Sequence, residues 1–548
     1  MLNKKYYPYI IAASAILFFI PFLGSVHLFD WDEINFAESA REMIVTGNFS
    51  RVQVDFHPFW EKPPLFFWMQ AGCMNIFGIN EFAARLPDAL FGIISLLTFY
   101  FIGKKLKDEK FGLIWSLAYM GSFLPHLYFK SGIIDPVYNY FIFLTIFFIY
   151  LVIQEPDNRK SMFYSFLGGV SIGLATLTKG PVGFLVISLS VVVYWITVRF
   201  KKLTGFWNIV VFAIAFALVS SLWFGLEVMK HGLWFLTEFI KYQVNLFLTP
   251  VAGHGGPVYY HFVVVFLGCF PISVIALPRI FGKKTLKQES SDLFLKWMVI
   301  LFWVVMILFT IVKTKIVHYS SLTYFPLSFI AAYFIYELVN KPSELKKWQI
   351  RMILITGSIF SILLIALPLL AQHRELLIPL IRDKFAVACL STNVKWSGLE
   401  FLTGLIYFII LCFSIVLLSK EKILKGFIIM FYATSFCMFF YLLTVVPGIE
   451  KYSQGPAIDF YKSIAGRDVY VGTEGFYSYA PFFYFQKKPG ENEKSSDREW
   501  LLNGPIDKPA YLVAKVTSKN LFDKHPDCVL LKQEGGFLFY LRMPVPKR

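Results

Sequence analysis

Residues 206–225 read FWNIVVFAIAFALVSSLWFG, a stretch without a single charged side chain. Its length matches the ~20 residues with which an α-helix crosses a ~30 Å hydrocarbon layer. Similar apolar runs recur from the beginning of the chain to about residue 446. The sequence therefore predicts a polytopic α-helical membrane protein.

The overall composition agrees with this class. Of 548 residues, 57% are hydrophobic and 16% are charged, whereas a soluble domain carries about 25% charged residues. The formal net charge of +16 would also suit a nucleic-acid-binding protein. However, the cations lie between the apolar runs rather than in one patch, so a lipid bilayer is expected as partner and no nucleic acid is.

About thirteen membrane spans are expected from the apolar runs. They lie near residues 7–26, 82–103, 111–130, 132–153, 162–178, 181–199, 206–225, 258–279, 294–312, 319–338, 350–371, 398–419 and 424–446.

The lysines and arginines of the short loops predict the orientation. Alternate short loops contain Lys104, Lys105, Lys107 and Lys110; Arg159 and Lys160; Lys201 and Lys202; Lys283, Lys284 and Lys287; Lys346 and Lys347; and Lys420, Lys422 and Lys425. Basic short loops stay on the cytoplasmic side of a membrane. The N-terminus is therefore expected in the cytoplasm and, with an odd number of spans, the C-terminus outside, as for a multi-pass protein of the bacterial inner membrane.

The composition changes after Pro447. Short strand-like runs at residues 468–473, 510–516 and 537–542 are separated by Gly and Pro turns. We therefore expect two domains: a transmembrane domain over residues 1–446, with an outer loop at 27–81 that contains juxtamembrane helices, and a small exported (periplasmic) α/β domain over residues 447–548.

The expected outer loop concentrates charged residues next to the membrane. Asp32 and Glu33 follow the first apolar run, and Glu61-Lys62 precede Pro63 and Pro64. A helix beginning near Asp32 would place these acids at its positive end, which by itself favours acidic residues. The prolines can begin a second helix and leave Glu61 and Lys62 in front of it.

Further polar residues fall on the same side of the membrane in this topology. They are Asp135, Lys179, His254, Lys315 and Tyr319, each in or beside an outer turn. Ionisable groups near membrane spans are candidates for function, although lysines also extend to the interface without any such role.

These residues carry a resemblance to a known family. The chain resembles the GT-C class of integral-membrane glycosyltransferases, in the branch of bacterial lipid A aminoarabinose transferase and the protein O-mannosyltransferases. The matching motifs are Trp31-Asp32-Glu33, Phe36-Ala37-Glu38, Arg41-Glu42-Met43, Glu61-Lys62-Pro63, Arg85-Leu86-Pro87, Asp135-Pro136, Thr178-Lys179-Gly180-Pro181, Gly253-His254-Gly255-Gly256-Pro257 with Tyr259-Tyr260, and residues 315–319.

The resemblance implies an enzyme that moves a hexosyl or pentosyl group from a polyprenyl (undecaprenyl) phosphate donor to lipid A, another glycolipid or a protein. It implies Asp32 as the catalytic carboxylate, accompanied by Glu33 and Asp135. It also implies Glu61 as a ligand of zinc or magnesium. His254 is a candidate second metal ligand, and its glycine-rich surroundings suit a flexible loop equally well. The residues implied to bind the donor phosphate are Lys62, Arg85, Lys179, Lys315 and Tyr319.

The chain also departs from the aminoarabinose transferases. Asn35 stands where those enzymes usually have Arg, and Gln243, Leu246 and Phe247 replace a His…Arg-Phe element. These differences argue against aminoarabinose as the sugar. A transporter or flippase of lipid-linked sugars is the alternative, but it would favour polar groups at the bilayer midplane, whereas the acidic residues here lie at one surface.

Overall fold

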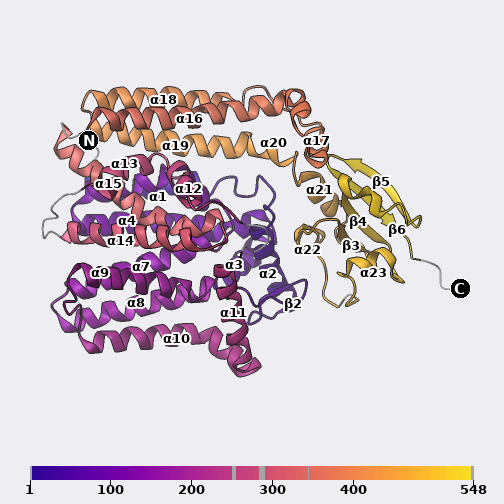
Figure 1. The fold of residues 1–548 in the computed structure, drawn as a ribbon, viewed down its shortest axis with the longest axis horizontal. Helices are drawn as coiled ribbons and strands as arrows, with labels where there is room; N and C mark the ends of the chain where they lie inside the picture. The colour runs from indigo at the N-terminus through magenta and orange to yellow at the C-terminus, as the bar shows by residue number, and fades with distance from the viewer. Residues whose placement is uncertain (1–2, 250–254, 283–289, 343–344, 491, 545–548) are drawn as a thin grey trace.

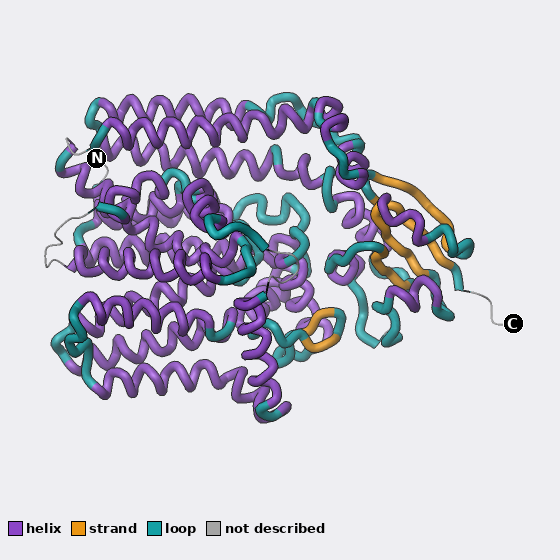
Figure 2. The backbone as a smooth tube through the Cα atoms, in the orientation of Figure 1, coloured by secondary structure: helices purple, strands orange, loops and turns teal. Residues whose placement is uncertain are grey.

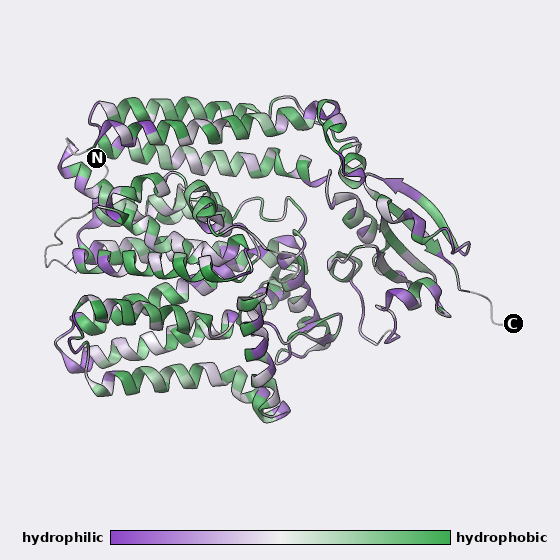
Figure 3. Cartoon of the chain, in the orientation of Figure 1, coloured by the Kyte–Doolittle hydropathy of each residue, from purple (hydrophilic) through white to green (hydrophobic). Residues whose placement is uncertain are grey.

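The computed structural model describes residues 3–249, 255–282, 290–342, 345–490 and 492–544. Most of the chain is helical, and the long helices lie side by side in a bundle that carries a small sheet-containing domain at one end (Figure 1). Figure 3 shows the bundle helices as predominantly hydrophobic. The polytopic helical fold predicted from the sequence is therefore confirmed.

The helices in chain order are α1 (Tyr7–Phe19), α2 (Asp32–Thr46), α3 (Leu65–Phe77), α4 (Glu81–Leu106), α5 (Glu109–Met120), α6 (Phe123–Tyr128), α7 (Asp135–Gln154), α8 (Asn158–Lys179), α9 (Val182–Thr197), α10 (Phe206–His231), α11 (Trp234–Leu248), α12 (Tyr260–Gly268), α13 (Ile272–Ile280), α14 (Ser290–Ile311), α15 (Tyr324–Asn340), α16 (Lys347–Gln372), α17 (Lys384–Leu390), α18 (Leu402–Ser419), α19 (Ile423–Thr444), α20 (Val446–Glu450), α21 (Gly455–Ile464), α22 (Ala480–Phe485) and α23 (Arg498–Asn503). A 3-10 helix, η3 (Val317–Thr323), leads into α15. The strands are β1 (Gln53–Val54), β2 (His57–Pro58), β3 (Tyr470–Glu474), β4 (Ala510–Lys515), β5 (Cys528–Glu534) and β6 (Phe537–Arg542).

Nine helices of the described residues are long and apolar enough to cross a membrane, counting η3 and α15 as one. The expected span at 258–279 is different, because α12 and α13 meet at an angle of 118°. Pro271, which lacks an N–H group, caps the start of α13 and prevents a continuous helix. The apolar run expected to form a span is therefore helical but broken at Pro271.

The expected span at 111–130 is also interrupted. It divides into α5 and α6 at Gly121, where the backbone of Phe431 in α19 approaches so closely that an added Cβ would lie 2.4 Å from its Cα. The first expected span is shorter than predicted, since α1 ends at Phe19. The break at Gly121 thus coincides with tight packing against α19, which hydropathy does not record.

The two ends of the bundle differ in character. The tube in Figure 2 shows short loops at the end away from the sheet and longer loops with extra helices at the other. Lys104 at the short-loop end forms a 3.3 Å ion pair with Glu109. Lys283, Lys284 and Lys287 lie outside the described residues, and the direction of the chain across the membrane stays a prediction.

The C-terminal part contains a four-stranded sheet of order β3-β4-β6-β5. β3 and β4 are parallel, whereas β6 is antiparallel to both of its neighbours. The three strands expected from the sequence are present, and β5 was not predicted because most of its side chains are exposed. Helix α21 packs Phe460 on Phe539 of the sheet, with ring centroids 4.4 Å apart.

Helix α2 lies between the bundle and the C-terminal domain (Figure 1). It begins at Asp32, as expected, and ends at Gly47, which adopts the left-handed conformation that glycine tolerates (φ 67°). Eleven of its residues, Glu33 to Met43, are buried. Helix α3 begins directly after Pro63-Pro64. Two helices, α2 and α3, therefore lie within residues 27–81, while their position at a membrane surface stays a prediction.

Candidate functional site

A cavity of about 790 Å³ opens at the end of the bundle that faces the C-terminal domain. Its walls come from the starts of α2 and α7, the end of α8, α11, η3 and Tyr479 of the C-terminal domain. Eight of the ten residues predicted from the sequence line it: Asp32, Glu33, Glu61, Lys62, Arg85, Asp135, Lys179 and Tyr319. The fold thus gathers side chains that are up to 287 positions apart, from Asp32 to Tyr319.

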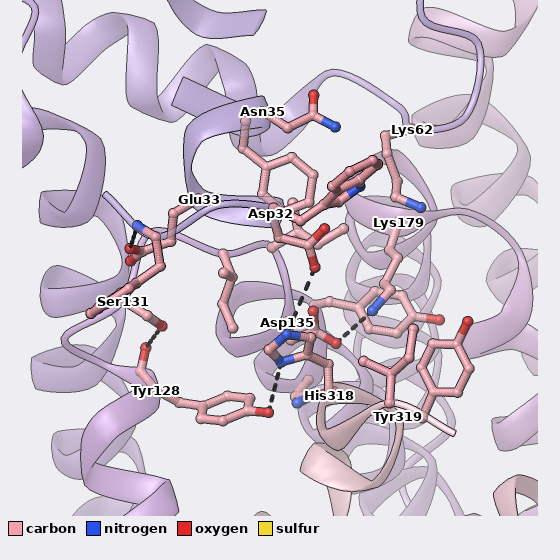
Figure 4. A pocket seen from close by; sticks show the side chains of 18 of the residues that line it. Asp32, Glu33, Asn35, Lys62, Tyr128, Ser131, Asp135, Lys179, His318 and Tyr319 are labelled. Atoms are coloured by element: carbon pink, nitrogen blue, oxygen red, sulfur yellow. Dashed lines mark hydrogen bonds and ion pairs between the residues drawn. The ribbon is translucent and has the colours of Figure 1, made fainter. Parts of the chain in front are cut away.

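Asp32 and His318 face each other across this cavity (Figure 4). The distance between Asp32 Oδ2 and His318 Nε2 is 3.7 Å. On its other side, His318 Nδ1 lies 2.8 Å from the hydroxyl of Tyr128. The carboxylate is 40% exposed, so it is accessible to a molecule that enters the cavity. A carboxylate oriented by an imidazole can accept a proton or stabilise a positive centre.

Lys179 ends α8, and Asp135 begins α7, where Pro136 occupies the first turn. Lys179 Nζ donates a hydrogen bond of 2.5 Å to Asp135 Oδ1. Gly180 follows with φ of 106°, a conformation that allows the chain to turn sharply after the lysine. The ion pair holds the ammonium group at the cavity wall (Figure 4).

Lys62 is a second ammonium group in the cavity wall. Burial lowers the pKa of Lys62, the neighbouring Glu61 opposes this shift, and the positive charge of Lys179 adds to it. Tyr319 contributes its ring 5.8 Å from Lys179 Nζ. Two cations and a phenol facing one space create a site suited to an anion such as a phosphate.

Glu33 and Arg85 also reach the cavity wall, but they bind each other. Arg85 Nε and Nη2 donate to the two oxygens of Glu33 at 3.0 and 2.8 Å. The Arg85 Nη1 and Nη2 groups also donate to the carbonyls of Leu23, Val26 and His27. Although burial raises the pKa of Glu33, the Arg85 guanidinium and backbone hydrogen bonds outweigh it and hold the pKa below its usual range.

Two predicted residues are placed elsewhere. Lys315 does not line the cavity, since its ammonium donates to the carbonyls of Phe309, Thr310 and Val312 at the end of α14. Such a lysine stabilises a helix C-terminus. His254 lies outside the described residues.

Glu61 was predicted as a metal ligand. Its Oε2 accepts a 2.5 Å hydrogen bond from the hydroxyl of Tyr242 in α11. No group of three or more His, Cys, Asp or Glu side chains that could hold a metal ion occurs in the part of the chain that the structure describes. Glu61 therefore has no such set of partner ligands among the described residues, His254 lies outside them, and we derive no step through a metal.

The sequence placed His318 in the motif at residues 315–319 but assigned it no role, and it gave no sign of Tyr128 or Tyr242. His318 lies only three positions from Lys315, in the same motif, which was the one available signal. Tyr128 and Tyr242 are recognised only through their contacts with His318 and Glu61. Among 29 tyrosines, nothing in the sequence marks these two.

Comparison with known proteins supports the resemblance. The family model for dolichyl-phosphate-mannose-protein mannosyltransferase matches residues 61–224. The undecaprenyl phosphate-alpha-4-amino-4-deoxy-L-arabinose arabinosyl transferase 1 of Proteus mirabilis is 26% identical over 335 residues, which is 60% of this chain and 59% of the relative. The corresponding Shewanella sediminis transferase is 24% identical over 451 residues, covering 80% of this chain and 77% of that one.

The solved structures match over a longer range. The crystal structure of ArnT from Cupriavidus metallidurans bound to undecaprenyl phosphate superposes with a TM-score of 0.78 at 17% identity, covering 98% of this chain and 99% of ArnT. An archaeal oligosaccharyltransferase, AglB from Archaeoglobus fulgidus, gives a TM-score of 0.51 at 11% identity, covering 94% of this chain and 70% of AglB. The chain therefore has the ArnT fold and resembles the GT-C integral-membrane glycosyltransferases.

Proposed function

We propose that this protein transfers a sugar from an undecaprenyl-phosphate donor to an acceptor outside the cytoplasm, with lipid A or another glycolipid as the first candidate and an exported protein as the other. The observation that carries the proposal is the cavity that places the accessible carboxylate of Asp32 and the ammonium groups of Lys62 and Lys179 around one space. This pairing supplies an anion site for the donor and a base for the acceptor. The names of the relatives and of the bound ligand in ArnT agree with this chemistry.

The lysines bind and neutralise the donor phosphate in this proposal. The phosphate accepts hydrogen bonds from Lys62 and Lys179, and these charge-assisted bonds strengthen as negative charge develops on the phosphate oxygen. Asp135 holds Lys179 through its 2.5 Å hydrogen bond. Asp135 therefore positions the ammonium group of Lys179 and does not contact the reacting atoms.

Asp32 acts on the acceptor. A hydroxyl or phosphate oxygen of the acceptor attacks the anomeric carbon of the donor sugar, and the bond between that carbon and the phosphate oxygen breaks. Asp32 takes the proton of the attacking group where there is one, and undecaprenyl phosphate leaves with the bonding electrons. His318, 3.7 Å from Asp32 and fixed by Tyr128, orients the carboxylate.

Glu33 and Arg85 have a positioning role in this scheme. Their ion pair joins the start of α2 to α4 and to the loop at residues 23–27. Because the Arg85 nitrogens already donate to Glu33 and three carbonyls, we assign Arg85 to holding Asp32 in place instead of to the phosphate. We also exclude Lys315 from the phosphate site, because its ammonium group donates to backbone carbonyls.

The identity of the sugar is a finer question. Asn35 lines the cavity one turn after Asp32, at the position where the resemblance leads us to expect Arg. The neutral amide changes the charge that faces the substrate, so we propose a sugar other than aminoarabinose.

The proposal is tested by mass spectrometry of lipid A, other glycolipids and exported proteins from cells with and without the gene. A hexose or pentose mass that is lost on deletion, restored by the wild-type gene and not restored by Asp32→Asn would support it. Identical spectra from wild-type and deletion cells that express the gene at a normal level would contradict it.

A further inference from the structure

Three aromatic side chains meet where the C-terminal domain reaches the start of α2. Trp31 and Tyr479 line the cavity, and Tyr477 contacts both. The ring centroids are 5.3 Å apart for Trp31 and Tyr477, 5.0 Å for Trp31 and Tyr479, and 5.1 Å for Tyr477 and Tyr479. We refer to Trp31, Tyr477 and Tyr479 as the aromatic platform.

The platform is exposed at the cavity mouth. Trp31 is 49% and Tyr477 is 48% accessible, whereas Tyr479 is buried beneath them. Large aromatic side chains that stay exposed beside a functional cavity are typical of a binding surface, because ring area that could be buried is left uncovered. The platform therefore has room for a ligand.

Polar groups surround the platform. The exposed Asp30 accepts a hydrogen bond from the backbone N–H of Tyr479 through Oδ1 at 3.4 Å. The guanidinium of Arg498 lies 5.3 Å from the centre of the Tyr477 ring. A surface that contacts lipid tails would be apolar throughout, so this mixture of rings, a carboxylate and a guanidinium favours a polar ligand with an apolar face.

We propose that the aromatic platform binds the saccharide part of the acceptor glycolipid, an inference that rests on the proposed function. One face of a pyranose ring presents C–H groups that pack on an aromatic ring, while its hydroxyl groups can hydrogen-bond to Asp30 and to Arg498. Trp31 directly precedes Asp32, so a sugar that packs on Trp31 brings its substituents to the catalytic carboxylate.

The position of the platform selects the acceptor over the donor. Lys179 belongs to the bundle, whereas Tyr477 and Tyr479 belong to the C-terminal domain, and α2 with Asp32 lies between the two (Figure 1). The platform therefore reaches the cavity from the C-terminal domain, whereas Lys179, one of the two proposed phosphate ligands, enters it from the bundle. An acceptor held on the platform and a donor held by the lysines can thus meet at Asp32.

Steady-state kinetics with purified full-length protein test the inference. The assay combines an undecaprenyl-phosphate sugar with glycolipid extracted from cells that lack the gene, and it measures KM for each substrate. Tyr477→Ala should raise the acceptor KM about tenfold, the effect of removing one stacked aromatic ring. Its donor KM and melting temperature should not change.

Three further variants separate stacking from other causes. Tyr477→Phe keeps the ring and should retain a near-wild-type acceptor KM, while Tyr477→Leu keeps apolar volume without the ring and should behave like Tyr477→Ala. Trp207→Ala removes an aromatic ring that is 67% exposed at the start of α10, away from the cavity, and should change neither KM.

An unchanged acceptor KM in Tyr477→Ala and Tyr477→Leu would overturn the inference while leaving the proposed function in place. A rise in the donor KM alone would also overturn it, since the rings would then bind the donor sugar. If the wild-type protein transfers no sugar to any extracted glycolipid, the inference fails together with the glycolipid acceptor of the proposed function, and transfer to exported protein then tests what is left of that function.

Discussion

The substitution Glu33→Gln distinguishes a positioning role from a catalytic one. The Glu33 carboxylate is buried and accepts four hydrogen bonds: two from Arg85 at 3.0 and 2.8 Å, one from the N–H of Phe29 at 2.9 Å and one from the N–H of Gly132 at 2.6 Å. Glutamine keeps the shape but not the charge, and it leaves the buried Arg85 guanidinium without a counter-ion. Removing one partner of a buried ion pair typically costs about 3–5 kcal/mol.

This cost should be visible in thermal unfolding of the purified protein in detergent. A loss of this size lowers the melting temperature by about 5 °C in a chain this long. Asp32→Asn is the matched control, because Asp32 is adjacent in sequence and 40% exposed, and its one ion pair among the described residues is with His318, at 3.7 Å. We expect its melting temperature to stay within about 1 °C of wild type, as is usual for exposed substitutions.

The pH dependence of the melting temperature tests the role of Glu33 independently. The pKa of Glu33 is held below its usual range in the folded protein, so its stabilisation is complete above the unfolded pKa of about 4.3 and is lost as the pH falls through the lower folded value. Wild type should therefore lose stability in acid, and Glu33→Gln should lose less. A Glu33→Gln protein with a wild-type melting temperature but no turnover would refute the positioning role and restore the catalytic one.

Three further predictions concern the cavity and the contacts that hold it. Lys62→Ala should weaken binding of undecaprenyl phosphate about 10- to 100-fold. Because burial lowers the pKa of Lys62, the affinity of wild type should begin to fall with rising pH below the usual lysine pKa of about 10.4, and Lys62→Arg should abolish this fall. Titration of binding at several pH values checks both results. Tyr242→Phe removes the hydrogen bond to Glu61 and should reduce kcat/KM for the donor about tenfold without lowering the melting temperature. If kcat/KM of this variant equals that of wild type, the contact is dispensable. Gln454→Ala removes two hydrogen bonds to the segment before Asp32, one with the N–H of Asp30 and one with the carbonyl of Leu28. We expect kcat to fall about tenfold with unchanged donor affinity, and a change in donor affinity alone would argue against a positioning role for Gln454.

The sequence predicts the helices that face lipid better than those that are bent inside the bundle. The run at 206–225 corresponds to α10, which is long, apolar and largely exposed along its length. The run at 258–279 is also apolar but contains Pro271, and its two halves diverge by 118°. A proline inside an apolar run predicts a break in the helix. The close approach of α19 to Gly121 could not be predicted, because it depends on packing between residues 310 positions apart.

The residues of the candidate site also differ in how well the sequence predicted them. Asp32, Lys62 and Lys179 stand in short motifs next to helix ends, so residue type and position together indicated a site. Arg85 and Lys315 have the right charge in the right motifs, but their hydrogen bonds go to carbonyl groups and, for Arg85, to Glu33. Which cation stays available to a ligand depends on its neighbours in the folded chain, and a sequence alone does not contain them.

The most direct measurement is a transfer assay that compares wild type with Asp32→Asn under identical donor saturation. The assay follows the sugar from undecaprenyl phosphate to glycolipid extracted from cells lacking the gene, and a separate titration measures donor binding. We predict that wild type transfers the sugar, and that Asp32→Asn binds the donor with unchanged affinity but turns over about 10²- to 10⁴-fold more slowly, the usual contribution of a general base. Turnover by Asp32→Asn within a few-fold of wild type would contradict the account, because asparagine caps a helix as well as aspartate but cannot accept the proton.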